Sequence, residues 1–122
     1  MARYVRVDNL TRGTPLATRC RVASSLGDRT VGLLGTRGLD EGAGLLIQRS
    51  PSIHMFFMRY PIDAVFVDAQ SEVVRTVAAL RPWRVVLWAR GARDCLELPT
   101  GSIARSGTQP GDRLGVMPTS DR

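Results

Sequence analysis

Two polar side chains that could exchange a proton, His54 and Asp63, lie within the most apolar stretch of the chain, Ser52–Asp68. His54 is the only histidine, and beside a carboxylate it would form an acid–base pair. A polar group buried without a partner costs about 1–3 kcal/mol. Each of the two must therefore be hydrogen-bonded, hydrated, or placed at the edge of a cavity. Two interpretations stay open, a structural hydrogen bond of His54 to a carboxylate or the backbone, and a pair that faces a ligand.

The elements that must position this pair are two strands that meet at Pro61. Residues 53–60 alternate with a period of two and are mostly apolar on both faces, which predicts a strand covered on both sides. Pro61 interrupts the ladder because it lacks an N–H. Residues 62–67 then predict a second strand, followed by a turn. The corner indicates either a hairpin or a bent central strand.

The rest of the chain predicts further short strands and little helix. Ser25 and Asp28 form a capping box that predicts a short helix ending near Gly35, and residues 100–107 predict a turn or a second short helix. Within residues 92–98, Leu96 and Leu98 should face one way, with Cys95 and Glu97 facing the other. Further strands are predicted at 4–7, 16–23, 44–48, 72–80, 85–88 and 113–117. The fold class expected is therefore mostly β, a compact antiparallel β-sandwich or barrel-like single domain.

Length and composition fit one ordinary globular domain. A chain of 122 residues with 43% hydrophobic and 23% charged residues can bury a core without a disulfide or metal. The domain is expected to span 1–122, with its core at about 3–117 and a flexible tail at 118–122. No signal peptide and no membrane segment is visible, so the expected compartment is the cytoplasm.

The net charge of +6 comes with seventeen basic residues, all arginine. Arginine favours phosphate and nucleic acid, but these arginines are scattered along the chain without interleaved aromatic residues. The pattern argues against a nucleic-acid partner, which would need a basic stripe on one face. The chain is expected to be a monomer or a weak homo-oligomer.

The two cysteines, Cys20 and Cys95, lie far apart and lack a CxxC spacing. A metal site is therefore not expected, and whether the two pair in a disulfide stays open. No nucleophile elbow and no cofactor motif is visible.

Several motifs appear in a fixed order along the chain: Arg29–Gly35, Gly44–Ile47, Ser52–Met58, Pro61–Asp68, Leu96–Gly101 and Gly111–Asp112. Together they resemble the domain of unknown function (DUF) family 192, also called UPF0127, over roughly residues 17–117. The chain departs from the family pattern at Val31, Thr36 and Met55. The resemblance implies a compact, mostly β domain with a short helix in its N-terminal third. It implies no activity, because no biochemical function is established for the family.

The polar residues of these motifs form a hypothetical binding cleft. Its predicted members are Arg29, His54, Met58, Asp63, Glu97 and Asp112. Arg29 would hold an anion, and His54 with Asp63 or Glu97 would be the acid–base pair. A structural role competes at each position: Glu97 could accept amide hydrogen bonds near Gly101, and Asp112 could stabilise a β-turn.

Three functions are compatible with these residues. We expect a non-enzymatic module that binds a small ligand or a protein through this cleft. The first alternative is a small hydrolase, lyase or isomerase that uses His54 and a carboxylate. The second is an arginine-rich nucleic-acid accessory protein, whose affinity would fall steeply with salt.

Overall fold

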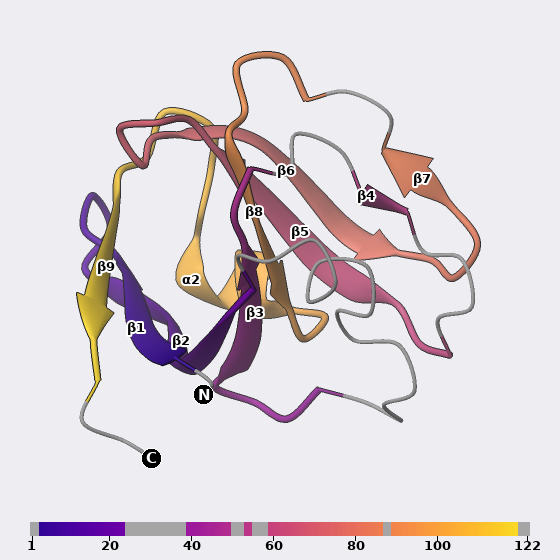
Figure 1. Cartoon of the computed structure of the whole chain (residues 1–122), viewed down its shortest axis with the longest axis horizontal. Helices are drawn as coiled ribbons and strands as arrows, with labels where there is room; N and C mark the ends of the chain where they lie inside the picture. The colour runs from indigo at the N-terminus through magenta and orange to yellow at the C-terminus, as the bar shows by residue number, and fades with distance from the viewer. Residues whose placement is uncertain (1–2, 24–38, 50–52, 55–58, 87–88, 120–122) are drawn as a thin grey trace.

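The computed structural model describes residues 3–23, 39–49, 53–54, 59–86 and 89–119 (Figure 1). Nine strands and one helix lie within them. The strands are β1 (Arg3–Asn9), β2 (Thr14–Ala23), β3 (Ala43–Ile47), β4 (Ile53–His54), β5 (Ile62–Val67), β6 (Val73–Leu80), β7 (Val85–Val86), β8 (Asp94–Leu98) and β9 (Leu114–Pro118); the helix is α2 (Ser102–Ser106).

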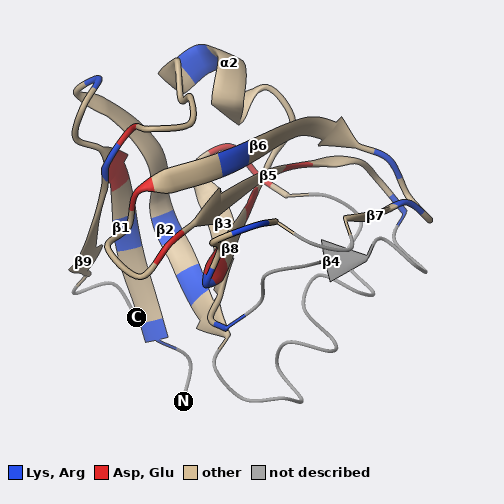
Figure 2. Cartoon of the chain, turned by 90° about the horizontal axis from the view of Figure 1, so that it is seen from above, with Lys and Arg blue, Asp and Glu red and all other residues tan. Residues whose placement is uncertain are grey.

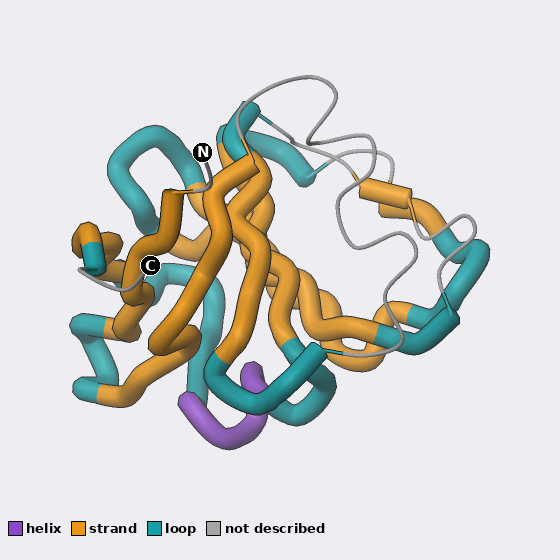
Figure 3. The backbone as a smooth tube through the Cα atoms, turned by 60° about the horizontal axis from the view of Figure 1, so that its bottom comes forward, coloured by secondary structure: helices purple, strands orange, loops and turns teal. Residues whose placement is uncertain are grey.

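Seven of the strands form one curled sheet in the order β6-β5-β8-β3-β2-β1-β9 (Figures 1 and 3). Its two ends approach each other, because Glu72 beside β6 forms a bridge to Arg113 beside β9. The result is a half-barrel, which confirms the predicted mostly β, barrel-like fold class. The expectation of an antiparallel sheet holds with one exception: β2 and β3 are parallel. The pairing of strands that are not joined by a hairpin cannot be derived from their alternation alone.

The strands on either side of Pro61 belong to different sheets. β5 lies between β6 and β8 in the large sheet, whereas β4 pairs with β7 in a separate two-stranded ribbon. The predicted hairpin or bent central strand is therefore wrong for the described residues. Pro61 instead marks the point at which the chain passes from the ribbon to the sheet.

Two hydrophobic cores lie on the two faces of the curled sheet. The inner core receives residues from all seven strands: Val5, Val7, Leu16, Ala17, Cys20, Val22, Leu46, Val65, Val67, Val73, Leu96, Leu98 and Leu114. The outer core joins the opposite face of the sheet to β7: Ala23, Leu45, Ile47, Ile62, Ala64, Phe66, Leu80, Val86, Ala89 and Cys95. Strand β5 is buried along its whole length because it serves both cores. In β8, Leu96 and Leu98 face the inner core and Cys95 faces the outer one, as the alternation predicted.

The short helix α2 lies at one end of the half-barrel (Figure 3). Its neighbour Gly107 adopts the left-handed conformation and donates its N–H to the Ile103 carbonyl, which ends the helix as a C-terminal glycine usually does. This confirms a helix within the predicted 100–107 segment. The predicted helix after Ser25 lies outside the described residues. Among the residues that are described, no helix has the length and apolar character needed to cross a membrane.

Candidate functional site

Glu97 is a buried carboxyl in an apolar environment. It lies in β8 directly between Leu45 of β3 and Ala64 of β5, and both of these neighbours belong to the outer core. Only 7% of the residue is exposed, and no described residue donates a hydrogen bond to its carboxyl. No fully buried side-chain oxygen of the described residues lacks a partner, so this carboxyl keeps a small accessible area. Burial alone raises the pKa of Glu97 to about 7, since an apolar environment disfavours the charged form.

Asp63 is buried as deeply but is fully hydrogen-bonded. Its Oδ1 accepts the Ala79 N–H at 2.8 Å and its Oδ2 accepts the Ile103 N–H at 2.9 Å. Ala79 has a φ of 51° and lies at an irregularity of the β5–β6 pairing, where its N–H bonds to this carboxylate and not to a strand partner. The carboxylate therefore joins β6 to α2, and no acceptor oxygen is left without a partner.

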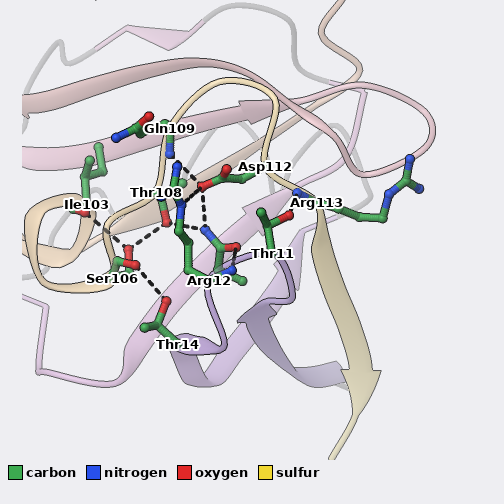
Figure 4. A network of polar contacts seen from close by, with 10 residues as sticks. Thr11, Arg12, Thr14, Ile103, Ser106, Thr108, Gln109, Asp112 and Arg113 are labelled. Atoms are coloured by element: carbon green, nitrogen blue, oxygen red, sulfur yellow. Dashed lines mark hydrogen bonds and ion pairs between the residues drawn. The ribbon is translucent and has the colours of Figure 1, made fainter.

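Asp112 is the centre of a second hydrogen-bonded network (Figure 4). Its Oδ2 accepts Asn9 Nδ2, Arg12 Nε and the Gln109 N–H, each at 3.0 Å. The hydrogen bonds to the Arg12 and Asn9 side chains lower the pKa of Asp112 to about 2. This carboxylate ties the turn between β1 and β2 to the segment before β9.

The network continues through three hydroxyl groups. Asn9 Nδ2 also donates to Thr108 Oγ1 at 3.0 Å, and Thr108 Oγ1 lies 2.6 Å from Ser106 Oγ. Thr14 Oγ1 donates to the Ser106 carbonyl at 2.7 Å. These contacts link α2 to the β1–β2 hairpin, as Figure 4 shows.

The remaining predicted cleft residues are described only in part. The backbone of His54 lies in β4, paired with Val85 of β7. Val86, the next residue of β7, packs in the outer core. Arg29 and Met58 lie outside the described residues, and their predicted roles stay predictions.

The described acids do not gather at one point. Glu97 shares a sheet face with Ala64, whereas Asp63, the residue before Ala64, has its side chain on the opposite face because successive side chains of a strand alternate. Asp112 is engaged at the β1–β2 turn. Of the predicted cleft residues with described side chains, only Glu97 is buried without a polar partner, and it is the one best suited to meet a ligand.

A cavity of about 260 Å³ lies elsewhere, between the first half of β2, the turn at Glu41 and Gly42, and α2. Glu41 and Arg105 contribute opposite charges to its lining. Sequence reasoning missed both residues, because no spacing relates two positions that are brought together only by the fold. It also missed the network residue Asn9, although an asparagine at a strand end before a turn is a recognisable signal.

The two thiols lie on opposite faces of the sheet. Cys20 belongs to the inner core and Cys95 to the outer core, and both are free. Burial raises the pKa of Cys20 to about 12 and that of Cys95 well above its usual value. Neither is therefore activated as a nucleophile. Within the described ranges, no group of three or more His, Cys, Asp or Glu residues is placed to hold a metal ion.

The basic residues are distributed over several elements. Figure 2 shows arginine segments on β1, β2, β6 and α2, interrupted by acidic ones. Part of this charge is locally engaged: Arg6 Nε lies 3.0 Å from Asp8 Oδ2, and the Arg19 guanidinium stacks 3.9 Å from the centre of the Tyr4 ring.

Comparison with known proteins gives a consistent result. The model of DUF192 (Uncharacterized ACR) matches residues 7–116. A UPF0127 protein of Thermococcus sibiricus is 33% identical over 110 residues, covering 87% of this chain and 71% of that protein. A UPF0127 protein of Pyrococcus furiosus is 32% identical over 109 residues, covering 87% and 93%.

Two solved structures share the fold. A putative transcription regulator from Sinorhizobium meliloti superimposes with a TM-score of 0.81 at 23% identity, over 95% of this chain and 94% of that chain. A protein of unknown function from Novosphingobium aromaticivorans gives a TM-score of 0.75 at 22% identity, over 93% and 84%. The half-barrel, the ordered motifs and the match over residues 7–116 together show that this chain belongs to the DUF192 family, also called UPF0127.

Proposed function

We propose that this DUF192 protein is a non-enzymatic binding module whose ligand, a small molecule or a protein segment, contacts the Glu97 carboxyl. One observation carries the proposal: Glu97 is buried in the outer core and has no hydrogen-bond donor among the described residues. Buried polar side chains in folded proteins are normally hydrogen-bonded. A ligand that supplies the missing partner would account for this exception.

The other buried acids of the chain support this interpretation by contrast. Asp63 accepts hydrogen bonds at both oxygens, and Asp112 accepts three at one oxygen. Acids with a purely structural role in this protein are thus supplied with donors. Glu97 differs from them although it is only 7% exposed.

The surroundings of Glu97 define what it could bind. Leu45 and Ala64 flank it on the neighbouring strands, so a ligand must combine apolar surface with one polar group. Because the pKa of Glu97 is about 7, the side chain would donate a hydrogen bond at lower pH and attract a cation at higher pH. The preferred ligand class is therefore an apolar molecule or segment with a single amine or other hydrogen-bonding group.

The alternative is a small hydrolase, lyase or isomerase that uses His54 and Glu97. The raised pKa of Glu97 favours this alternative too, since general acid–base groups work best near the operating pH. Asp63 is less suited to that role because both its oxygens already accept amide N–H groups. Loss of a measured turnover in both His54→Ala and Glu97→Gln would select this alternative.

Native mass spectrometry of the purified protein, compared with its denatured mass, tests the proposal. Three variants accompany the wild type: Glu97→Gln, Glu97→Leu, and Glu72→Gln as a matched acid outside the outer core. A thermal-shift screen of amines with apolar substituents is run on the same four proteins. We expect bound adducts or thermal shifts in the wild type and Glu72→Gln, and their loss in both Glu97 variants.

The opposite result is equally informative. Identical adducts and shifts in all four proteins would show that Glu97 contacts no ligand. Glu97→Leu also separates binding from folding, because replacing a buried, unpaired acid by leucine should stabilise the protein. A stable Glu97→Leu variant that keeps every ligand would refute the proposal.

A further inference from the structure

The cavity beside α2 is a separate site of a size that suits one small molecule. Its volume is about 260 Å³, near the lower end of ligand pockets, which span about 300–1,000 Å³. Pro15, Leu16 and Ala17 of β2 form its apolar part. Glu97 is not in its lining, so the cavity is independent of the proposed outer-core site.

Opposite charges enter this cavity from two different elements. Glu41 lies in the turn before β3 and Arg105 in the last turn of α2. Among the described residues, no ion pair or hydrogen bond engages either side chain, including one between the two. As far as the described residues go, the lining of the cavity thus carries one anion and one cation that are not paired.

The three hydroxyl groups in the lining already donate hydrogen bonds to backbone carbonyls. Thr14 Oγ1 donates to the Ser106 carbonyl at 2.7 Å, Ser102 Oγ to the Pro99 carbonyl at 2.6 Å, and Thr18 Oγ1 to the Gly42 carbonyl at 3.3 Å. Their lone pairs remain as acceptors. Apart from Arg105, the side chains that line the cavity therefore offer acceptors only.

Two glycines allow side chains of the cavity lining to lie close to the backbone. Gly101 has φ of +93°, and a Cβ there would lie 2.6 Å from Arg105 Nη1, so the guanidinium rests directly over this glycine. Gly42 has φ of +86°, and a Cβ there would lie 2.8 Å from Thr18 Oγ1. Glycine is required at both positions by the close approach and by the backbone conformation.

We propose that this cavity binds a small zwitterion, with its ammonium group toward Glu41 and the hydroxyl oxygens and its carboxylate toward Arg105. A guanidinium is well matched to a carboxylate, with which it can form two parallel hydrogen bonds. An ammonium group has three donors and no acceptor, which matches a wall of acceptors. The ligand class is therefore an unbranched amino acid whose two charged groups are separated by a short apolar linker.

Backbone amide shifts in the ¹⁵N NMR spectrum of the full chain test this proposal. The probes are glycine, β-alanine, γ-aminobutyrate and 5-aminovalerate, with butylamine and butyrate as singly charged controls. The variants are Glu41→Gln and Arg105→Gln, with Arg90→Gln as the matched loss of an exposed arginine outside the cavity. All three replaced side chains are exposed, so the variants should fold.

We expect at least one zwitterion to shift the amides of Gly42 and Ser102 in the wild type and in Arg90→Gln. Removing one charge, from the probe or from the protein, should weaken binding by about tenfold or more, since a hydrogen bond to a charged group contributes roughly that factor. The proposal is overturned if no zwitterion shifts these amides at about 10 mM, where a ligand with a Kd of 1 mM would nearly saturate the site. It is also overturned if butyrate binds as well as γ-aminobutyrate, which would leave an anion site at Arg105 alone.

Discussion

At the scale of single residues, the three buried acids show how one side-chain type serves different purposes. Asp63 and Asp112 accept hydrogen bonds. These bonds stabilise backbone that does not follow regular strand geometry. Glu97 lies in a regular strand between apolar neighbours. Its burial must therefore cost stability that the other two acids do not cost.

The pH dependence of stability should reveal this cost. The pKa of Glu97 is about 7 in the folded protein against 4.5 for the ordinary group, so the folded state retains a proton that the unfolded state releases. The penalty is absent below about pH 4.5, grows as pH rises, and reaches about 3 kcal/mol above pH 7. Glu97→Gln should accordingly match the wild type near pH 4.5 and exceed it by up to about 3 kcal/mol at pH 8.

Urea unfolding at the two pH values measures this difference, with Glu72→Gln as the control substitution. An equal gap between Glu97→Gln and the wild type at both pH values would contradict the assignment of an unpaired, buried carboxyl.

Asp112 should have the opposite pH dependence. Its pKa is lowered from 3.8 to about 2, so its contribution to stability is complete above about pH 4 and is lost as the pH falls toward 2. Asp112→Asn should unfold several degrees below the wild type at neutral pH, and this gap should shrink progressively at acidic pH. Asp8→Asn is the control, because the exposed Arg6–Asp8 pair contributes little. A gap that stayed constant down to pH 2 would exclude the ionised network.

At the scale of elements, the irregular pairing of β5 and β6 stores backbone strain at Ala79. Its φ of 51° is a left-handed conformation that costs an L-residue about 1–2 kcal/mol. The Asp63 carboxylate holds it there by accepting the Ala79 N–H. The strain is thus the local cost of connecting β6 to α2.

Replacing Ala79 by glycine should relieve this strain. Ala79→Gly is expected to stabilise the protein by about 0.5–1 kcal/mol, whereas Ala78→Gly, next to it on the same strand, should destabilise it by about 0.5–1 kcal/mol. Both residues are exposed, so packing changes little in either case. The urea unfolding midpoints of the two variants are compared with that of the wild type. A loss of stability in both variants would mean that Ala79 is not strained.

The sequence predicted the individual strands better than the way in which they pair. Alternation alone placed Leu96 and Leu98 opposite Cys95 and Glu97, and the cores confirm the two sides. The parallel pairing of β2 with β3 was not predictable, since it depends on which distant strand lies alongside. The same limit applies to the site: the sequence identified Asp63 as a polar exception, but its partners at Ala79 and Ile103 exist only because a strand irregularity and a helix meet there.

At the scale of the whole molecule, the two cores have unequal cover. The inner core is enclosed by strands from the whole curled sheet. The outer core is covered, within the described residues, by a ribbon whose two strands pair over two residues each. The outer layer should therefore open more readily than the half-barrel.

The buried thiols can measure this difference. In Cys20→Ala the remaining thiol, Cys95, reports on the outer core, and in Cys95→Ala the remaining Cys20 reports on the inner core. We expect Cys95 to be alkylated faster than Cys20 under native conditions, although both should react slowly because burial raises the pKa of each thiol. Equal rates, matching global unfolding, would show that the two layers open as one cooperative unit.

The pairing of β9 with β1 has a consequence for how the protein is made. Val5 lies opposite Pro118, and the Thr119 N–H bonds to the Tyr4 carbonyl, so β1, the first of the described strands, lacks this partner until β9, the last of them, has been synthesised. Until then the outer edge of β1 exposes unpaired backbone groups, which is the condition under which nascent chains join edge to edge. Chaperone demand during synthesis should therefore depend on the time that separates the synthesis of β1 from that of β9. Slow codons between these two strands should increase aggregation more than slow codons placed after β9.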